Sequence, residues 1–160
     1  MLINFSSLPK SSRIWIYQAN RELTTADIKM MEKNAAEFCE NWSAHGHDLQ
    51  TSFKILHNMF LVLAVNEDAA LPSGCSIDAS VHFVKELGTS LGIDFFNRTH
   101  VAFLLNDEIY VEALQVLKNK IGSGTISSST PMINTTVKDV REFETKWIIP
   151  AGESWIKRYF

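Results

Sequence analysis

A short segment, SGCSID at residues 73–78, brings together side chains that could do chemistry. Ser76 resembles a helix N-cap, which would place Cys75 near the positive end of a helix dipole, where the thiolate is favoured. Asp78 and His82 are four residues apart and so adjacent on a helix surface. Both lie more than about 100° from the centre of the apolar stripe, on the side that also carries Cys75. A thiol, an imidazole and a carboxylate on one face form a candidate set of nucleophile, base and orienting group.

Three hypotheses for this segment stay open. In the first, Ser73, Gly74 and Ser76 belong to a site for an unknown small molecule or protein partner. In the second, the protein is a small thiol-dependent enzyme with Cys75 as nucleophile, although seven residues of helix, about 10 Å of rise, separate Cys75 from His82. In the third, the segment only caps a helix, and the protein is a structural or oligomeric accessory protein. Whether the chain is an enzyme is therefore undecided at this stage.

Other reactive residue types fit simpler interpretations. His45 and His47, with Gly46 between them, have no third ligand nearby in sequence, so we expect a polar turn and neither a metal nor a cofactor. Cys39 lies on an apolar helix stripe and is expected in the core. The Trp, Met and Phe residues of the helices are likewise interpreted as core by their spacing. The loop GSGTISSST, residues 122–130, lacks the lysine of a Walker A loop and is expected to be a flexible surface connector.

The elements that must position these residues follow a β-α-β-β-α-β order. Period-two and period-3.6 patterns predict strands, helices and a tight turn at His57-Asn58. Thr24 and Asp27 resemble a capping box, and Gly46 is expected to stop the first helix. The predicted elements are a strand Arg13–Tyr17, a helix from Thr24 to about Ala44, strands Thr51–Leu56 and Met59–Val65, a helix from about Ser76 to Leu91, and a strand Val101–Leu105. This order predicts an α+β fold with a ferredoxin-like sheet.

Both faces of that sheet are expected to be packed against other parts of the protein. Trp15 and Tyr17 point opposite to Ile14 and Ile16, so each face carries large apolar groups. The sequence predicts one domain over residues 1–160, with the β-α-β-β-α-β core at 1–106 and a helical extension at 107–160. Helices over Tyr110–Ile121 and Thr136–Ile148, with a tail Ser154–Phe160, would cover the second face or mediate contact with a second copy of the chain.

The composition argues against nucleic-acid-binding, membrane-spanning and disulfide-rich proteins. The chain has 160 residues, a net charge of −3 and ordinary apolar and charged fractions of 46% and 21%. Lys and Arg are scattered, so nucleic acid is not expected as a partner. No apolar run has the length of a membrane span, no signal peptide is apparent, and two cysteines make no disulfide framework. We therefore expect a soluble cytoplasmic protein that binds no membrane.

Four separated motifs resemble those of a family of small uncharacterised bacterial proteins. They are RIWIYQANRELT at Arg13–Thr24, WSAHG at Trp42–Gly46, SGCSIDASVHFVKEL at Ser73–Leu87 and FETKWIIPAGESW at Phe143–Trp155. Members often carry the label "ABC transporter ATPase". The resemblance implies no activity and no functional residues. The label itself conflicts with the sequence, because the chain lacks the phosphate-cradling GxxxxGK[ST] loop of such an ATPase.

Overall fold

The computed structural model describes residues 1–160 and divides them into two compact units. The first unit comprises Met1–Phe96 and Lys138–Arg141, and the second comprises Asn97–Val137 and Glu142–Phe160. The protein mixes helices with antiparallel sheets and is α+β, as the sequence predicts. The units do not follow the expected division after residue 106, because the chain enters the second unit at Asn97.

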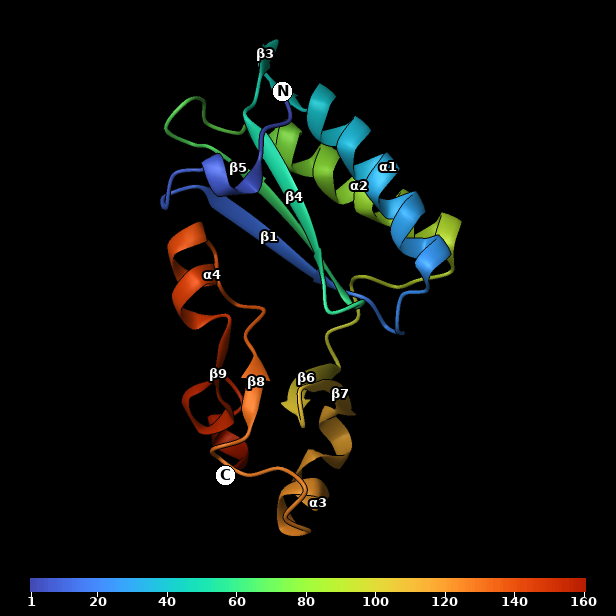
Figure 1. Cartoon of the computed structure of the whole chain (residues 1–160), viewed down its shortest axis with the longest axis vertical. Helices are drawn as coiled ribbons and strands as arrows, with labels where there is room; N and C mark the ends of the chain where they lie inside the picture. Colours follow the sequence, from blue (N-terminus) through green and yellow to red (C-terminus); the bar gives the residue numbers. More distant parts are fainter. The chain divides into compact units, whose positions relative to one another are not determined.

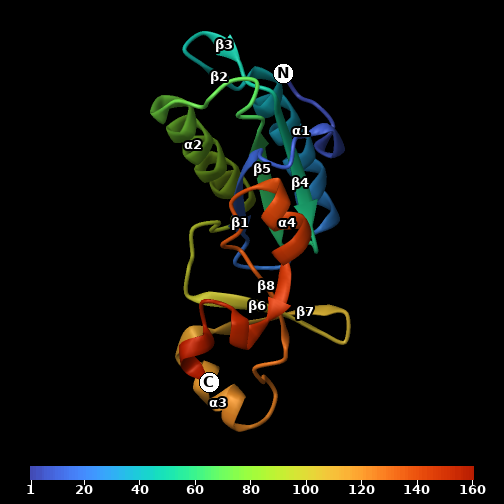
Figure 2. The ribbon, with the colours of Figure 1, turned by 90° about the vertical axis from the view of Figure 1, so that its left-hand side faces the viewer.

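The first unit is built on a three-stranded antiparallel sheet of order β1-β5-β4. Helices α1 and α2 lie on the same side of this sheet (Figures 1 and 2). Its elements are a 3-10 turn Phe5–Ser7, β1 (Arg13–Gln18), α1 (Thr25–Asn41), β2 (Ser43–Ala44), β3 (His47–Asp48), β4 (Thr51–Leu56), β5 (Phe60–Val65) and α2 (Gly74–Leu91).

Strand β5 is the centre of this unit. All six of its residues are buried, as expected for the run that is apolar at every position. On β1, Trp15 contacts Trp42 at the end of α1, with ring centroids 5.7 Å apart, and Tyr17 hydrogen bonds to Ser80 of α2. Strand alternation therefore turns Trp15 and Tyr17 towards the helices and Ile14 and Ile16 to the other face.

Local signals decide where the first two helices begin and end. The capping box of Thr24 and Asp27 is confirmed, with the Asp27 N–H bonded to the Thr24 hydroxyl and the Asp27 carboxylate accepting the Thr24 N–H. The first helix ends at Asn41 and not near Ala44, and Gly46 does not stop it. Gly46 instead occupies the two-residue turn between β2 and β3, where its φ of 76° follows a φ of 52° at His45.

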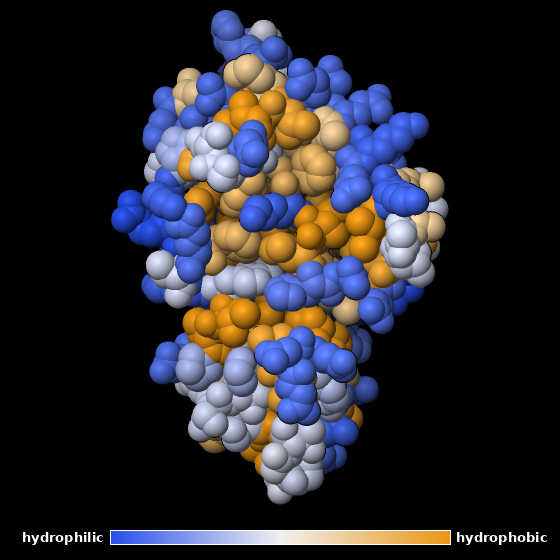
Figure 3. Space-filling model, in the orientation of Figure 1, coloured by the Kyte–Doolittle hydropathy of each residue, from blue (hydrophilic) through white to orange (hydrophobic).

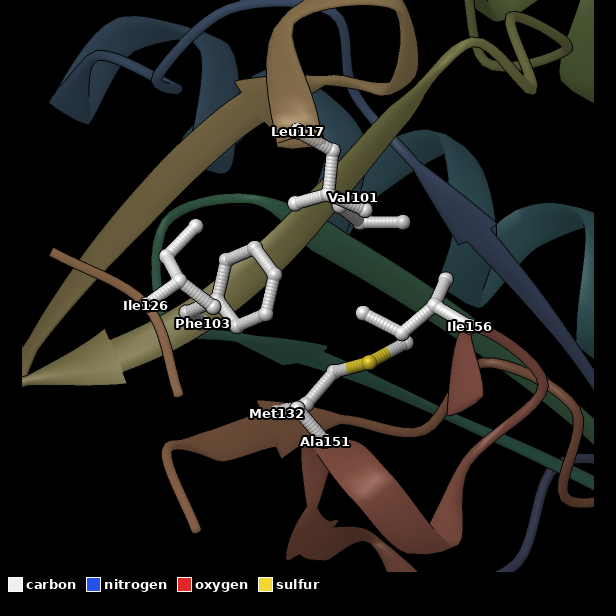
Figure 4. Packing of buried hydrophobic residues seen from close by; sticks show 7 residues of the cluster. All are labelled: Val101, Phe103, Leu117, Ile126, Met132, Ala151 and Ile156. Atoms are coloured by element: carbon white, nitrogen blue, oxygen red, sulfur yellow. The ribbon is translucent and has the colours of Figure 1, made fainter. Parts of the chain in front are cut away.

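The second unit holds a four-stranded antiparallel sheet of order β7-β6-β8-β9. Its elements are β6 (His100–Leu105), β7 (Glu108–Ala113), α3 (Leu117–Gly122), β8 (Pro131–Ile133) and β9 (Ile148–Pro150), together with most of α4 (Val140–Lys146) and 3-10 turns at Leu114–Val116, Ala151–Glu153 and Lys157–Tyr159. The sheet packs on a small core of its own (Figure 4), made of Val101, Phe103, Leu117, Ile126, Met132, Ala151 and Ile156.

The four-stranded ferredoxin-like sheet is not confirmed. Strands β1, β5 and β4 have the order and direction that this topology requires, but β6 pairs with β7 and β8 in the other sheet. The reason is a tight hairpin. Asn106 and Asp107 both have positive φ, 51° and 63°, and they turn the chain back along β6.

The predicted C-terminal helices are wrong in part for the same reason. Residues 110–113 extend β7, and the helix expected there is reduced to α3. The helix expected over residues 136–148 is the shorter α4, followed by β9. In the loop 122–130, Ile126 is fully buried, so this connector is anchored to the core. The short segment Lys138–Arg141 belongs to the first unit, where Ile14 N donates to Lys138 O and Val140 N donates to Ser12 O.

None of the helices combines the length and apolarity that crossing a membrane requires. Apolar residues also reach the surface that Figure 3 displays, in both units. The large apolar side chains that are clearly exposed are Met1, Met30, Leu71, Ile148, Trp155 and Phe160.

The end of α2 depends on a close approach that only glycine permits. A Cβ on Gly88 would lie 2.4 Å from the backbone oxygen of Ile93 and 3.4 Å from the ring of Phe95. We predict that Gly88→Ala lowers the free energy of unfolding by about 1–3 kcal/mol, as overpacking does in well-filled cores, when measured by urea denaturation.

The matched control is Gly74→Ala in the first turn of the same helix, where an added Cβ meets nothing within 4 Å. This change should leave stability unaltered or raise it by up to about 1 kcal/mol, because alanine is the better helix former. Equal stability of the two variants would contradict the close contact at Gly88.

Candidate functional site

The segment SGCSID forms the first turn of α2, but its cap is Ser73 and not Ser76. The Ser73 hydroxyl accepts the Ser76 N–H at 3.1 Å, and the Ser76 hydroxyl accepts the Ser73 N–H at 2.7 Å. The Ser76 hydroxyl also donates to the Ser73 carbonyl. Ser76 is buried and its own carbonyl accepts the indole N–H of Trp42 at 2.8 Å. The serines of the motif therefore hold the helix start together and tie it to α1.

The three candidate catalytic side chains are exposed but do not meet. Cys75, Asp78 and His82 all lie on the solvent side of α2, as their spacing indicates. None of the three side chains forms a hydrogen bond or ion pair with another, and the Cys75 sulfur has no hydrogen-bond partner. A base that activates a thiol must come within hydrogen-bond reach of it, and this arrangement supplies none.

Cys39 is the opposite case, as expected. It lies in the core between α1 and β4, where its sulfur approaches the Ser52 carbonyl at 3.8 Å. Burial raises the pKa of the Cys39 thiol to about 12, so the reactive thiolate is scarce at neutral pH.

His45, His57 and His100 lie in turns or form local hydrogen bonds. His45 and Gly46 form the turn of the β2–β3 hairpin, and His57 and Asn58, with φ of 53° and 51°, form the turn between β4 and β5. The Nδ1 atom of the His100 ring is hydrogen-bonded to the hydroxyl of Thr99. No group of three or more His, Cys, Asp or Glu side chains is arranged to hold a metal ion.

A groove lies between α1 and α2 in the first unit. Its volume is about 410 Å³, within the range of small-molecule sites. Phe38 of α1 and Phe83 of α2 meet in it as parallel rings, with centroids 4.4 Å apart and planes 3° from parallel. Both rings are only partly buried. The lining residues are Asn34, Glu37, Phe38 and Asn41 from α1, and Phe83, Glu86, Leu87 and Ser90 from α2.

The two helices that form the groove are fixed to each other at both ends. At one end Trp42 donates to Ser76 O, and its ring packs on Phe38 with centroids 4.9 Å apart. At the other end Arg21 donates to the carbonyl of Leu91, the last residue of α2, at 2.7 Å. The Arg21 guanidinium also donates two hydrogen bonds to the Asp27 carboxylate in the first turn of α1, with nitrogen–oxygen distances of 2.6 and 3.3 Å. The groove therefore lies in a helix pair that is held before any ligand arrives.

The polar groups of the groove expose acceptors more than donors. Asn41 Nδ2 donates to the Glu37 carbonyl, and the Ser90 hydroxyl donates to the Glu86 carbonyl. These bonds leave the Asn41 Oδ1 and Ser90 Oγ lone pairs available, together with one N–H of Asn41 and the side-chain amide of Asn34. The carboxylates of Glu37 and Glu86 are in no ion pair and accept no hydrogen bond.

A second polar cluster lies in the second unit on β7 and α3. The Tyr110 hydroxyl donates to the Glu112 carboxylate, and Lys120 lies 3.8 Å from the same carboxylate. The hydrogen bond from Tyr110 lowers the pKa of Glu112 and raises that of Tyr110. The three groups satisfy one another, so the cluster fastens α3 to the hairpin.

Sequence reasoning assigned the helix aromatics to the core, and for the groove this was wrong. Phe38 lies on the apolar stripe of α1 yet stays half-exposed. Phe83 gave a usable signal, since it lies about 100° from the centre of the α2 stripe, where a buried side chain is not expected. That Phe38 and Phe83 stack could not be read from either helix alone.

Comparisons of the chain with protein-family models, with curated proteins and with solved structures find no match in any of the three. The resemblance to a bacterial family therefore stays a prediction. Function has to be argued from the groove, the cysteines and the charges of this chain.

The cysteines allow a direct test of which thiol is accessible. We predict that iodoacetamide labels Cys75 at least about tenfold faster than Cys39 in the native protein at pH 8, because Cys39 is buried with a raised pKa. Mass-spectrometric mapping of both sites against time measures the two rates.

In urea the two rates should converge, which serves as the control for intrinsic reactivity. A Cys75→Ser protein should take up no label quickly in the native state. Native labelling of Cys39 at the rate of Cys75 would contradict its place in the core.

The Arg21–Asp27 pair predicts a pH dependence of stability. The Arg21 guanidinium, with the Thr24 N–H, holds the pKa of Asp27 well below its usual range. A carboxyl with a depressed folded pKa stabilises the fold above its unfolded pKa of about 3.9. This stabilisation begins to fall as the pH drops through that value and is fully lost only below the folded pKa. Asp27→Asn should therefore be less stable than the native protein at pH 7, by a difference that shrinks from about pH 5 downwards.

Urea unfolding at a series of pH values measures this difference. Asp48→Asn is the control, because Asp48 is exposed and its side chain is in no ion pair. A difference between Asp27→Asn and the native protein that is the same at pH 7 and pH 3.5 would rule out the predicted linkage.

Proposed function

We propose that this protein is a binding protein and that its site is the groove between α1 and α2. The observation that carries the proposal is the parallel pair of Phe38 and Phe83, left partly exposed in a concave, polar-rimmed surface. The exposed part of each ring can still gain stabilisation by packing on a ligand and leaving water.

The proposal moves the site away from the SGCSID segment. The hydroxyl groups of Ser73 and Ser76 are engaged in the capping box, so few polar groups of this turn are left to bind a ligand. The segment supports the site indirectly, because Ser76 O receives Trp42 and Trp42 packs on Phe38.

A thiol-dependent enzyme and a self-associating accessory protein are the alternatives. The first is less well supported, because no base contacts the Cys75 sulfur. The second rests on the exposed apolar side chains of the second unit, Ile148, Trp155 and Phe160. Neither offers a concave site with convergent polar groups, which is the usual form of a ligand site.

The groove can be tested with neutral probes that make no assumption about charge. We predict that indole and benzamide, added to ¹⁵N-labelled protein, shift the amide resonances of α1 and α2 around Phe38 and Phe83. Phe83→Ala should weaken this binding by about tenfold, because a stacked aromatic contact and its buried area are lost.

Phe160→Ala is the matched control, since it removes a ring of the same size that is exposed and does not line the groove. Far-UV circular dichroism checks that both variants are folded. Shifts confined to other elements, or an unchanged affinity in Phe83→Ala, would refute the groove as the binding site.

A further inference from the structure

The charged side chains that line the groove are all negative. Its only ionisable lining residues are Glu37 and Glu86, one on each helix. The basic residues of the two helices, Lys29, Lys33 and Lys85, do not line it. Lys85 lies instead over the ring of Phe96, 5.7 Å from its centroid. The Arg21 guanidinium, which joins the start of α1 to the end of α2, is engaged by Asp27 and Leu91 O. The groove therefore presents two carboxylates that form no ion pair with a cation of this chain.

The neutral polar groups favour the same kind of ligand. Asn41 and Ser90 donate hydrogens to helix carbonyls, so Oδ1 and Oγ remain as acceptors. The remaining N–H of Asn41 and the amide of Asn34 also reach the lining, so the donors there come from these two amides and are outnumbered by the acceptor lone pairs of the carboxylates, amides and hydroxyl. A ligand with several N–H donors satisfies such a lining, whereas an anion meets mainly oxygen atoms. An ammonium group has three donors and a full positive charge.

The aromatic pair adds a requirement for an apolar stem. The parallel rings of Phe38 and Phe83 form an apolar surface between the two carboxylate-bearing helices. Methylene groups gain free energy by packing on such rings, and a cation near a ring is attracted by its quadrupole. Glu37 and Glu86 line the same groove from different helices, so an aliphatic chain with an ammonium group at each end matches the two carboxylates better than a single cation does.

We propose that the groove binds aliphatic diamines and polyamines, with the methylene stem on Phe38 and Phe83 and the ammonium ends at Glu37 and Glu86. This inference rests on the proposed function of the groove and names its ligand class. The occupant is a free small molecule, because a volume of about 410 Å³ matches a small-molecule site.

The test compares ligands of equal length and different charge. 1,4-Diaminobutane, 1,5-diaminopentane and spermidine should bind in calorimetric titrations at low salt and should shift the amide resonances that line the groove. 1,5-Pentanediol and glutarate, neutral and anionic counterparts of the five-carbon diamine, should bind at least about tenfold more weakly. Added salt should weaken binding of the diamines, because the carboxylates lie at the surface.

Glu37→Gln and Glu86→Gln should each weaken diamine binding by about fivefold to tenfold, with a larger loss in the double variant. Both changes preserve shape and remove charge at exposed positions, so the variants are expected to fold. Glu32→Gln is the matched control, because Glu32 is an exposed glutamate of α1 that does not line the groove. Its affinity for diamines should equal that of the native protein.

The outcomes separate the two proposals. If indole and benzamide bind the groove but diamines bind no better than the diol, the ligand class is wrong and the proposed binding function stands. If neither class of probe binds there, both fail. Binding of a lysine-containing peptide without binding of free diamines would overturn the small-molecule assignment. Equal losses in Glu32→Gln and Glu86→Gln would mean that attraction to a protein of net charge −3 is non-specific, and would overturn the site.

Discussion

The hydrogen bond from the Trp42 indole to the Ser76 carbonyl is the contact on which the first unit's candidate site depends. It is buried, and an indole N–H left without a partner there would cost about 1–3 kcal/mol. It joins the end of α1 to the start of α2, while Arg21 joins the start of α1 to the end of α2 through Leu91 O. Two bonds at opposite ends fix an antiparallel helix pair, and the rings of Phe38 and Phe83 meet between them. A surface held in this way loses little conformational entropy when a ligand binds.

The same geometry explains why the SGCSID motif is better understood as structure than as chemistry. A capping box satisfies N–H groups that would otherwise be orphaned at a helix start, and here it also orients the Ser76 carbonyl towards Trp42. Cys75 and Asp78 are carried on the outer side of that turn as a consequence of helix periodicity. The candidate base is His82, and helix periodicity does not bring its ring to the Cys75 thiol, because contact along a helix surface requires spacings of three or four residues. Cys75 and His82 are seven residues apart.

The two units bury their apolar side chains in different ways. The first places a wholly apolar strand, β5, between two partners and covers one face of the sheet with two long amphipathic helices. The second has short strands and short helical turns, and its core draws on residues from β6, α3, β8 and the loop and tail around them (Figure 4). Residues such as Ile126 and Ile156 are buried in segments without regular periodicity. Such segments give no stripe or alternation from which burial can be predicted.

By itself the sequence determined the elements whose signals are local. The α1 capping box, the turn at His57-Asn58, the bounds of β4, the apolar β5 and the buried Cys39 all follow from neighbouring residues, and each is confirmed. Tertiary structure alone decided three things. It decided that β6 pairs within a second sheet, because the hairpin at Asn106-Asp107 offers β6 a partner close in sequence. It decided that Ser73 and not Ser76 caps α2, since the helix begins at Gly74 and the Ser76 N–H therefore falls to the Ser73 hydroxyl. It also decided that Phe38 and Phe83 stack at the surface, because contact between two helices depends on their relative rotation, which neither helix encodes alone.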